Sequence, residues 1–407
     1  MTDAPDVRDS ATEGPDEDRT APPGRRPWPA ARPSYASVAG RVGPDRAELV
    51  HEALLTGDRL ADDLVEEMHR RGMAFVHRQF ARAAAEGIEA VPDAGPALRA
   101  LFRQVEATPG FVGDDLLDRG STAFFTTATT VHTFSLTAGS LLRVYSAPSI
   151  ALVLAGTGRL MDGAARRIHE TGRWLYAAME SGAMRRGRAG YVATLQVRMM
   201  HAHMRRLARE RGFDETVHGV AINQVDLART WLDFTVTSLT AEERLGFDLT
   251  TAEQRDLYLY WQYIAHVLGV DRRLLADVGG HDDARRAYEL LQAVTGDPVD
   301  ASVDLARATL DAIAELLLAE TGYPRWVSMP VLLALSRSAQ GPQLADRLGL
   351  RRARVAELLL PVIVRVVRRQ RRSRRRAPRA WAAGIERNRR VVRASLSSGT
   401  GARTAAR

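Results

Sequence analysis

Residues 192–209 read VATLQVRMMHAHMRRLAR, and this stretch carries the helical periodicity that most of the chain repeats. Arg198, His201 and Arg205 are spaced i, i+3 and i+7, so an α-helix places all three on one face. Apolar side chains flank the same face: Val197, Met204 and Ala208. The stretch therefore predicts an amphipathic helix with a basic face that carries a histidine.

Stripes of the same period recur on both sides of this stretch. Apolar residues repeat at helical spacing in 57–71, 97–105, 221–239, 252–268, 282–294, 303–319 and 345–367. One stretch differs, because residues 121–137 are rich in Thr, Phe and Val, which favours a β-strand by propensity. The pattern as a whole predicts an all-α protein. We expect one large helical domain over residues 45–367, between disordered tails at 1–44 and 368–407.

The composition excludes several kinds of chemistry. The 407 residues include no cysteine, and all 57 basic residues are arginine because the chain has no lysine. Disulfides, thiolate metal sites, Schiff-base catalysis and the P-loop lysine are therefore excluded.

The net charge of +8 is unevenly distributed. Residues 361–407 contain 15 arginines and one acid, Glu386, a net charge of +14, which leaves −6 for the preceding 360 residues. A mildly acidic body argues against an enzyme with a basic nucleic-acid cleft. No apolar run reaches the roughly 20 residues that cross a bilayer, and residues 1–44 lack the apolar core of a signal peptide. We therefore expect a cytoplasmic protein with a solvated basic tail.

The basic face of residues 192–209 requires a counter-charge if it is buried, because an unpaired buried charge is very costly. A haem fits this pattern: His201 would ligate the iron, and Arg198 and Arg205 would bind the propionates. The same spacing also fits a half-exposed helix whose arginines are solvated. His203 lies on another face and is interpreted as a packed core histidine, whereas His266, which follows an aromatic run, is the alternative metal ligand.

A second polar group lies in residues 166–174, RRIHETGRW. In a helix Arg167, Glu170 and Thr171 share a face with Trp174. Together they offer a charge, a base and a hydroxyl, enough for a polar pocket. A surface Arg–Glu pair of little energetic weight explains the same residues.

Two further motifs have other interpretations. Asn223 is predicted to cap a helix, with Asp226 at the third helical position. Residues 343–359, QLADRLGLRRARVAELL, resemble a helix–turn–helix with Gly349 at the turn. Because the arginine-rich tail follows this segment, a DNA-binding regulator is an alternative function.

Taken in order, these segments resemble the family of rubber oxygenases (latex-clearing proteins) and MpaB-type oxygenases. The likeness spans residues 57–350, and its most specific part is the Arg-x-x-His-x-x-x-Arg pattern at Arg198, His201 and Arg205. The other matching stretches are 57–65, 167–171, 222–228 and 261–270. The resemblance also accounts for residues 344–350, since a similar Leu-Ala-Asp-x-Leu-Gly-Leu stretch ends that family's catalytic domain.

The resemblance implies an all-helical protein that encloses a haem b. By position, His201 would be the proximal ligand of the iron, and Arg198 and Arg205 would be its partners in cofactor binding. Arg167 and Thr171 match residues of the family's distal pocket, where they would donate hydrogen bonds to oxygen.

Three departures from the family pattern limit which of the family's properties we expect in this chain. Rubber oxygenases carry a lysine where Glu170 stands, and Glu170 would instead move protons. They also have a catalytic glutamate upstream of the Arg167 segment, whereas the only acid in residues 140–166 is Asp162, at a position that does not match. We also expect no secretion signal, which would be needed to reach polymeric rubber. Haem binding therefore transfers better than rubber cleavage.

We therefore expect a haem b-dependent oxygenase or oxidase of the MpaB type that uses O₂ on a small or lipid-like substrate, isoprenoids included. The alternatives are a peroxidase-like activity, a non-catalytic haem sensor or carrier, and the DNA-binding regulator. The basic tail predicts peripheral contact with the anionic inner face of the membrane, and an extension without any role is the alternative.

Overall fold

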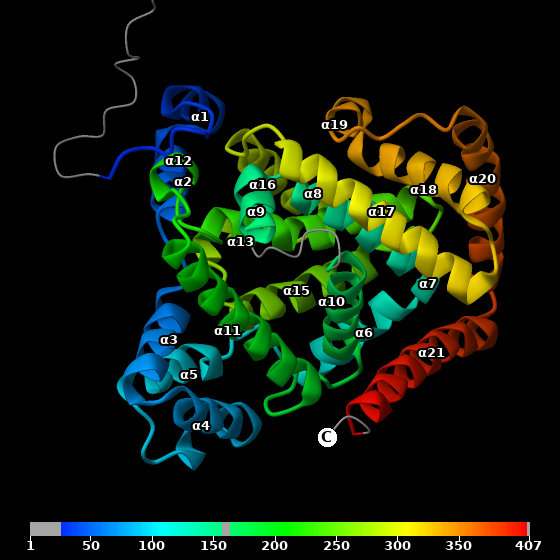
Figure 1. The fold of residues 1–407 in the computed structure, drawn as a ribbon. Helices are drawn as coiled ribbons and strands as arrows, with labels where there is room; N and C mark the ends of the chain where they lie inside the picture. The colour runs from blue at the N-terminus through cyan, green and yellow to red at the C-terminus, as the bar shows by residue number, and fades with distance from the viewer. Residues whose placement is uncertain (1–25, 157–162, 405–407) are drawn as a thin grey trace, which may run out of the picture.

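The computed structural model describes residues 26–156 and 163–404, and every regular element in those two ranges is a helix (Figure 1). The all-α prediction is confirmed. Elements η2 and η5 are 3₁₀-helices, and η3 and η4 are π-helices. The elements in chain order are α1 (Tyr35–Val42), α2 (Pro44–Leu54), α3 (Arg59–Arg71), α4 (Met73–Glu86), η2 (Ile88–Ala90), α5 (Pro96–Glu106), α6 (Asp114–Phe125), α7 (Thr129–Phe134), η3 (Ser135–Leu141), α8 (Leu142–Tyr145), α9 (Pro148–Ala155), α10 (Ala164–Met179), α11 (Ala189–Glu210), α12 (Glu215–His218), α13 (Gln224–Leu232), η4 (Asp233–Thr237), α14 (Ser238–Arg244), α15 (Thr251–Leu268), η5 (Arg272–Leu274), α16 (His281–Ala293), α17 (Asp300–Thr321), α18 (Arg325–Gln340), α19 (Pro342–Arg347), α20 (Arg354–Arg375) and α21 (Pro378–Thr404).

Helix α15 lies near the centre of the fold and packs against α6 and α11 (Figure 1). A capping box begins it: the Thr250 hydroxyl accepts the Glu253 N–H at 3.2 Å, and the Glu253 carboxylate accepts the Thr250 N–H at 2.8 Å. Gly269 ends it in the left-handed conformation, with φ at 75°. Its aromatic run is buried and forms part of the main core: Tyr258, Tyr260, Trp261 and Tyr263.

Helices α3, α4 and α5 form a group at the lower left of Figure 1, and α3 packs against α11. The side chain of Asp58 caps α3 by accepting the Ala61 N–H at 3.3 Å. The apolar stripe predicted for residues 57–71 is buried, as Leu64, Val65 and Met68 show. This packing brings the acidic beginning of α3 to the basic face of α11.

The strand predicted for residues 121–137 is wrong, because this stretch is helical in α6, α7 and the start of η3. Helical backbone tolerates its threonines because their hydroxyls turn back onto carbonyls one turn earlier. Thr133 donates to the Thr129 carbonyl at 3.0 Å, and Thr137 donates to that of Thr133. Burial of the surrounding helices then outweighs the β propensity.

In the described ranges, no single helix is long and apolar enough to cross a membrane. Residues Thr129–Tyr145 and Pro148–Ala155 meet that criterion only when taken together, and the two segments are bent by 94°.

The helical fold begins before the predicted boundary at residue 45. Residues 1–25 lie outside the described part, but 26–44 include α1 and fold onto the body. Trp28 is buried, and its indole N–H donates to the Pro33 carbonyl at 2.8 Å. Arg32 is buried and pairs with Asp226 at 3.2 Å. An aromatic anchor and a buried ion pair therefore order a segment whose proline content favours disorder.

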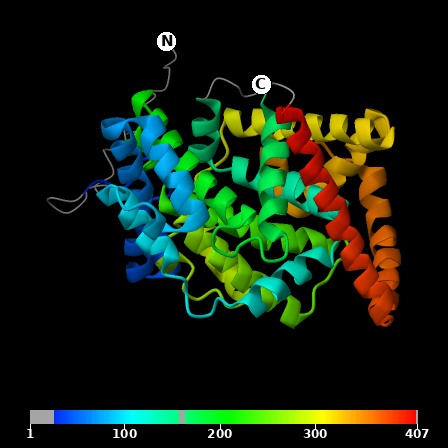
Figure 2. The same ribbon diagram turned by 90° about the horizontal axis from the view of Figure 1, so that it is seen from below.

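The fold also continues past the predicted boundary at residue 367, because α20 extends to Arg375 and α21 follows it (Figure 2). We expected the arginines of the C-terminal tail to stay solvated, and this prediction is wrong for one face of α20. Arg368, Arg371 and Arg375, spaced i, i+3 and i+7, turn inward, where Arg371 donates to the Thr126 carbonyl at 2.7 Å. Arg375 pairs with Glu253 at 2.6 Å. Like-charge repulsion is reduced because each inward arginine meets acceptors on the body.

Helix α21 packs along α6 and α10. Its Asn388 side chain donates to the carbonyls of Phe125 and Thr127, at 2.9 and 3.1 Å, and Val392 is buried. The described part of the basic tail is therefore an integral part of the helical domain.

Candidate active site

The basic face of α11 is clamped by α3 on both sides of His201. Arg198 is 2% exposed, and its guanidinium makes a bidentate pair with Asp58, with Nε–Oδ2 at 2.6 Å and Nη2–Oδ1 at 3.0 Å. Its third nitrogen donates to the Gln104 side chain at 2.6 Å and to the Val267 carbonyl at 3.3 Å. Every guanidinium nitrogen of Arg198 therefore has an acceptor in the protein.

Arg205 is held by a single carboxylate oxygen of Asp62, one helical turn beyond His201. It is 2% exposed, and it pairs with Asp62 at 2.8 Å from Nε and 2.7 Å from Nη2. It also donates to the Ile222 carbonyl at 3.4 Å. Burial raises the pKa of Asp62, while the hydrogen bond from Arg205 opposes that rise.

These two pairs change the interpretation of the arginines. The basic face does have the anions that burial requires, but they are Asp58 and Asp62 of the chain itself. In this structure Arg198 and Arg205 pair with these aspartates, whereas their spacing had suggested contacts with haem propionates. Their observed role is to fix the orientation of the α11 face on which His201 lies. The two aspartates are the residues that sequence reasoning missed, although residues 57–65 were among the matching stretches.

His201 is half-buried between the Arg198–Asp58 and Arg205–Asp62 pairs, which we call the two clamps. Its Nδ1 atom is buried and has no hydrogen-bond partner among the described residues. Burial, followed by the charge of Arg205, lowers the pKa of His201 to about 4, while Asp58 acts in the opposite direction. The imidazole is therefore neutral near neutral pH, which is the form that binds a metal.

The other two histidines considered have different surroundings. His266 has both ring nitrogens in contacts: Nδ1 lies 3.3 Å from Nε2 of Gln104, and Nε2 lies 3.2 Å from the Val105 carbonyl. Gln104 also holds Arg198, so His266 supports the clamp and is not an open ligand. His203 is half-buried, which differs from the packed core position predicted for it.

Two glycines allow the clamps to close. Gly269 has φ at 75°, and a Cβ there would lie 2.5 Å from both Arg198 Nε and Asp58 Oδ2. A Cβ at Gly57 would lie 2.8 Å from the Arg205 side chain. The Gln224 side chain joins these positions by donating to the carbonyls of Gly57 and Gly269, at 3.0 and 3.1 Å.

The segment around Asn223 adds further hydrogen bonds next to the two clamps. Asn223 caps α13 as predicted, because its side-chain oxygen accepts the Asp226 N–H at 2.9 Å. Asp226 is buried and also accepts hydrogen bonds from Arg32 and from Ser149 of α9, the latter at 2.8 Å. The matching stretches 57–65, 198–205, 222–228 and 261–270, far apart in the chain, thus form one polar assembly.

An apolar cluster separate from the main core lies beside the C-terminal half of α11. It consists of buried Val153, Ala208 and Ala221, with Met204, Phe213 and Ile222 packed on them. Met204 is one turn from His201 and Val153 belongs to α9. The surroundings of His201 are therefore polar where α3 clamps it and apolar toward α9.

Helix α10 carries the second predicted group. The Trp174 indole N–H donates to the Thr194 hydroxyl at 3.2 Å, and a Cβ at Gly190 would lie 2.7 Å from the Ala177 carbonyl oxygen, so α10 and α11 touch there. Figure 1 shows the two helices diverging from this contact toward the N-terminal end of α10 and the C-terminal end of α11.

The predicted members of this group do not all lie together. Arg167, Thr171 and Trp174 are half-buried, and the Arg167 side chain hydrogen-bonds to the hydroxyl of Tyr145. Glu170, by contrast, is 58% exposed and lies 3.8 Å from Arg166, one turn away. The surface-pair interpretation fits Glu170, and this exposed position does not support its predicted role in moving protons. Asp162 lies outside the described residues.

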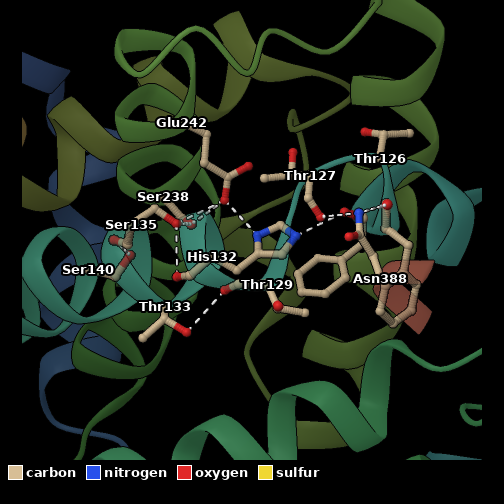
Figure 3. Close-up of polar contacts among 12 residues, drawn as sticks. Thr126, Thr127, Thr129, His132, Thr133, Ser135, Ser140, Ser238, Glu242 and Asn388 are labelled. Carbon is tan, nitrogen blue, oxygen red and sulfur yellow. Dashed lines mark hydrogen bonds and ion pairs between the residues drawn. The ribbon is translucent and has the colours of Figure 1, made fainter. Parts of the chain in front are cut away.

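A buried ionic cluster joins His132 of α7 and Glu242 of α14, in a stretch where sequence reasoning placed no functional residue (Figure 3). His132 Nδ1 lies 2.8 Å from Glu242 Oε1, and its Nε2 lies 2.9 Å from the Phe124 carbonyl. The Phe124 carbonyl only accepts hydrogen bonds, so Nε2 donates to it. Ser135 also donates to Glu242, at 2.9 Å.

Electrostatics in this cluster favour the carboxylate form of Glu242. Burial acts to raise the pKa of Glu242, but the charge of His132 and the hydroxyl of Ser135 prevail and hold it below its usual value. The adjacent cavity of about 10 Å³ has room for one water molecule at most. The cluster therefore holds α7, η3 and α14 together, and the cavity is too small for an organic substrate.

The helix–turn–helix-like segment 343–359 comprises α19, a turn at Gly349 with φ at 68°, and the start of α20. Ala345 and Leu348 are buried, and Arg337 donates to the Leu350 carbonyl at 2.6 Å. The first helix of this segment is therefore built into the helical domain.

The fold is an all-helical domain in which two buried ion pairs fix the helix face that carries His201. Residues 128–369 match the family model described as the catalytic domain of ER-bound oxygenase mpaB/B' and rubber oxygenase. The chain belongs to this MpaB and rubber oxygenase family and is an oxygenase, as its resemblance implied.

Two relatives support this assignment. The rubber oxygenase of Streptomyces sp. (strain K30) is 25% identical over 331 residues, which cover 80% of this chain and 77% of that protein. The solved structure of the latex clearing protein LCP in the closed state has the same fold, with a TM-score of 0.63 and 20% identity. It is matched over 78% of this chain and 84% of that one.

Proposed function

We propose that this oxygenase depends on haem b, bound through His201, and uses O₂ on a small or lipid-like substrate such as an isoprenoid. One observation carries the proposal: a neutral imidazole, with its Nδ1 buried and unpaired in the described part of the chain, sits on a helix face fixed by two buried ion pairs.

The residues around His201 fit a porphyrin. A porphyrin needs one axial nitrogen and an apolar surface, and the chain offers His201 and the cluster that includes Met204 and Val153. When bound, haem supplies the redox chemistry of O₂ activation, which no side chain of the chain provides.

The other side chains that would take part in the reaction lie on α10. Arg167, next to the Tyr145 hydroxyl, supplies a fixed positive donor, and Thr171 on the same face supplies a hydroxyl. Such donors polarise an oxygen atom held near them and orient it. The half-buried indole of Trp174 packs edge-on against Phe234 and Trp261 of the main core.

The proposal is tested by incubating the purified full-length chain with isoprenoid and fatty-acid substrates and measuring O₂ uptake and products. We expect a Soret band that shifts on reduction and on CO addition, and uptake that requires the substrate. A colourless protein, or uptake that persists unchanged in Arg167→Met, contradicts the proposal. A haem spectrum without any oxygenated product favours the sensor or carrier alternative.

A further inference from the structure

Helix α20 presents an apolar stripe to the exterior. Six apolar side chains at spacings of three and four residues are each more than half exposed, from 51% at Val366 to 77% at Leu358. The stripe comprises Val355, Leu358, Leu359, Val362, Ile363 and Val366. Contiguous exposed apolar side chains of this extent are uncommon on a monomeric soluble surface and mark an interaction site.

The same helix places arginines along and beyond the stripe. While Arg368, Arg371 and Arg375 turn inward to the body, Arg365, Arg369 and Arg372 are exposed. Arg365 borders the apolar stripe, and Arg369 and Arg372 continue its line toward the C-terminal end of the helix. Residues 351–376 contain eleven arginines and a single acid, Glu357.

An exposed tryptophan lies on the neighbouring helix. Helix α18 packs against α20 and begins next to Trp326, which is 78% exposed. Both views place α20 at the edge of the molecule (Figures 1 and 2). Tryptophan is enriched where proteins meet the headgroup region of a bilayer.

We propose that this face, the α20 stripe with its exposed arginines, docks the protein on an anionic lipid surface. An amphipathic helix with apolar side chains beside arginines has the composition of helices that lie in the membrane interface. A second copy of the chain is a poor occupant, because the exposed arginines of two such faces repel one another. An anionic bilayer satisfies both features, since headgroups attract the arginines and the acyl boundary accepts the stripe.

Docking would give the protein access to a lipid-like substrate, and only this consequence rests on the proposed function. Docking itself requires neither haem nor turnover. Vesicle binding and the haem spectrum can therefore fail independently of one another.

The test is cosedimentation of the full-length chain with vesicles of phosphatidylcholine, with and without phosphatidylglycerol. The basic variant carries Arg365→Gln, Arg369→Gln and Arg372→Gln, and the apolar variant carries Leu358→Gln, Val362→Gln and Val366→Gln. A matched control removes the same charge elsewhere on the exposed surface, by Arg70→Gln, Arg78→Gln and Arg103→Gln. Far-UV circular dichroism checks that each variant is folded.

We expect salt-sensitive binding to the anionic vesicles only. The basic variant should lower the partition coefficient on the order of 100-fold, because each arginine near an anionic surface contributes about one factor of five. The apolar variant should lower it by about 10-fold or more. The control should bind like the parent chain.

Three results overturn the proposal. Equal binding by all variants removes α20 from the interaction. Loss in the basic variant but not in the apolar one shows attraction of a solvated helix without docking of the stripe. Absence of vesicle binding, together with a concentration-dependent dimer that the apolar variant abolishes, identifies a second copy as the occupant.

Discussion

Replacing Asp58 by asparagine tests the clamp that fixes the α11 face. Asparagine caps a helix as well as aspartate does, so Asp58→Asn removes the charge and leaves the cap of α3 in place. Arg198 is 2% exposed and would lose its bidentate carboxylate, whose oxygens lie 2.6 and 3.0 Å from its nitrogens. Breaking a buried pair in this way costs about 3–5 kcal/mol.

The lower part of that range applies here, because Gln104 and the Val267 carbonyl still accept from Arg198. We therefore expect a loss of about 3 kcal/mol, which lowers the urea midpoint by at most about 1 M, because the m-value of a chain of this size is about 3 kcal/mol/M or larger. Unfolding in urea, followed by circular dichroism, measures the loss. Glu170→Gln, which breaks an exposed pair, is the matched control and should change stability by no more than about 0.5 kcal/mol.

A double variant separates the lost charge from a lost contact. Asp58→Asn combined with Arg198→Met removes both charges, so it should be less destabilised than the sum of the single variants. A cost for Asp58→Asn no larger than that of Glu170→Gln, or full additivity of the pair, would refute the role assigned to the clamp.

Three further predictions follow from the site. His201 has a folded-state pKa of about 4, below its unfolded value of 6.5, so the unfolded state binds the proton first. The haem-free protein should lose stability as the pH falls from 6.5 toward 4, and His201→Gln should flatten that slope in urea midpoints. Gly269→Ala should destabilise by about 2 kcal/mol or more in thermal unfolding, because φ is positive and the clamp leaves no room for a Cβ. Gly172→Ala, in an open helical position, should stabilise by about 0.5–1 kcal/mol. Arg167→Met should lower substrate-dependent O₂ uptake at least tenfold (about 1.4 kcal/mol), while Glu170→Gln should leave it unchanged.

Each of these predictions has a clear contrary result. An unchanged pH slope in His201→Gln would mean that the buried imidazole does not control acid stability. Equal melting temperatures for the two glycine variants would contradict the close approach at Gly269. A loss of uptake in Glu170→Gln would restore the role in proton movement that the sequence suggested.

The basic face of α11 could be predicted from the sequence because helical periodicity is a local property. Arg198, His201 and Arg205 do share a face, and the need for a counter-charge was correctly inferred. The identity of the counter-charge could not be predicted, because Asp58 and Asp62 lie about 140 residues away in the chain. Only the packing of α3 on α11 brings the two pairs together.

The C-terminal tail shows a different limit of prediction from the sequence. A count of arginines treats residues 361–407 as one charge, and that count predicts repulsion and solvation. The structure divides the arginines of α20 by face, so that Arg371 is buried against Thr126 while Arg369 remains exposed. Which face meets acceptors depends on the positions of the body's own carbonyls and carboxylates, and these are set by the tertiary fold.

The central claim is that His201 binds haem b, and haem content tests it most directly. The measurement is the amount of haem per chain, by the pyridine haemochrome assay, in purified full-length protein and in His201→Ala, His203→Ala and His266→Ala. We expect one haem per chain in the parent, in His203→Ala and in His266→Ala, and none in His201→Ala, with the helical circular dichroism of all four retained. Haem that persists in His201→Ala, or that is lost only in folded His266→Ala, would contradict the assignment.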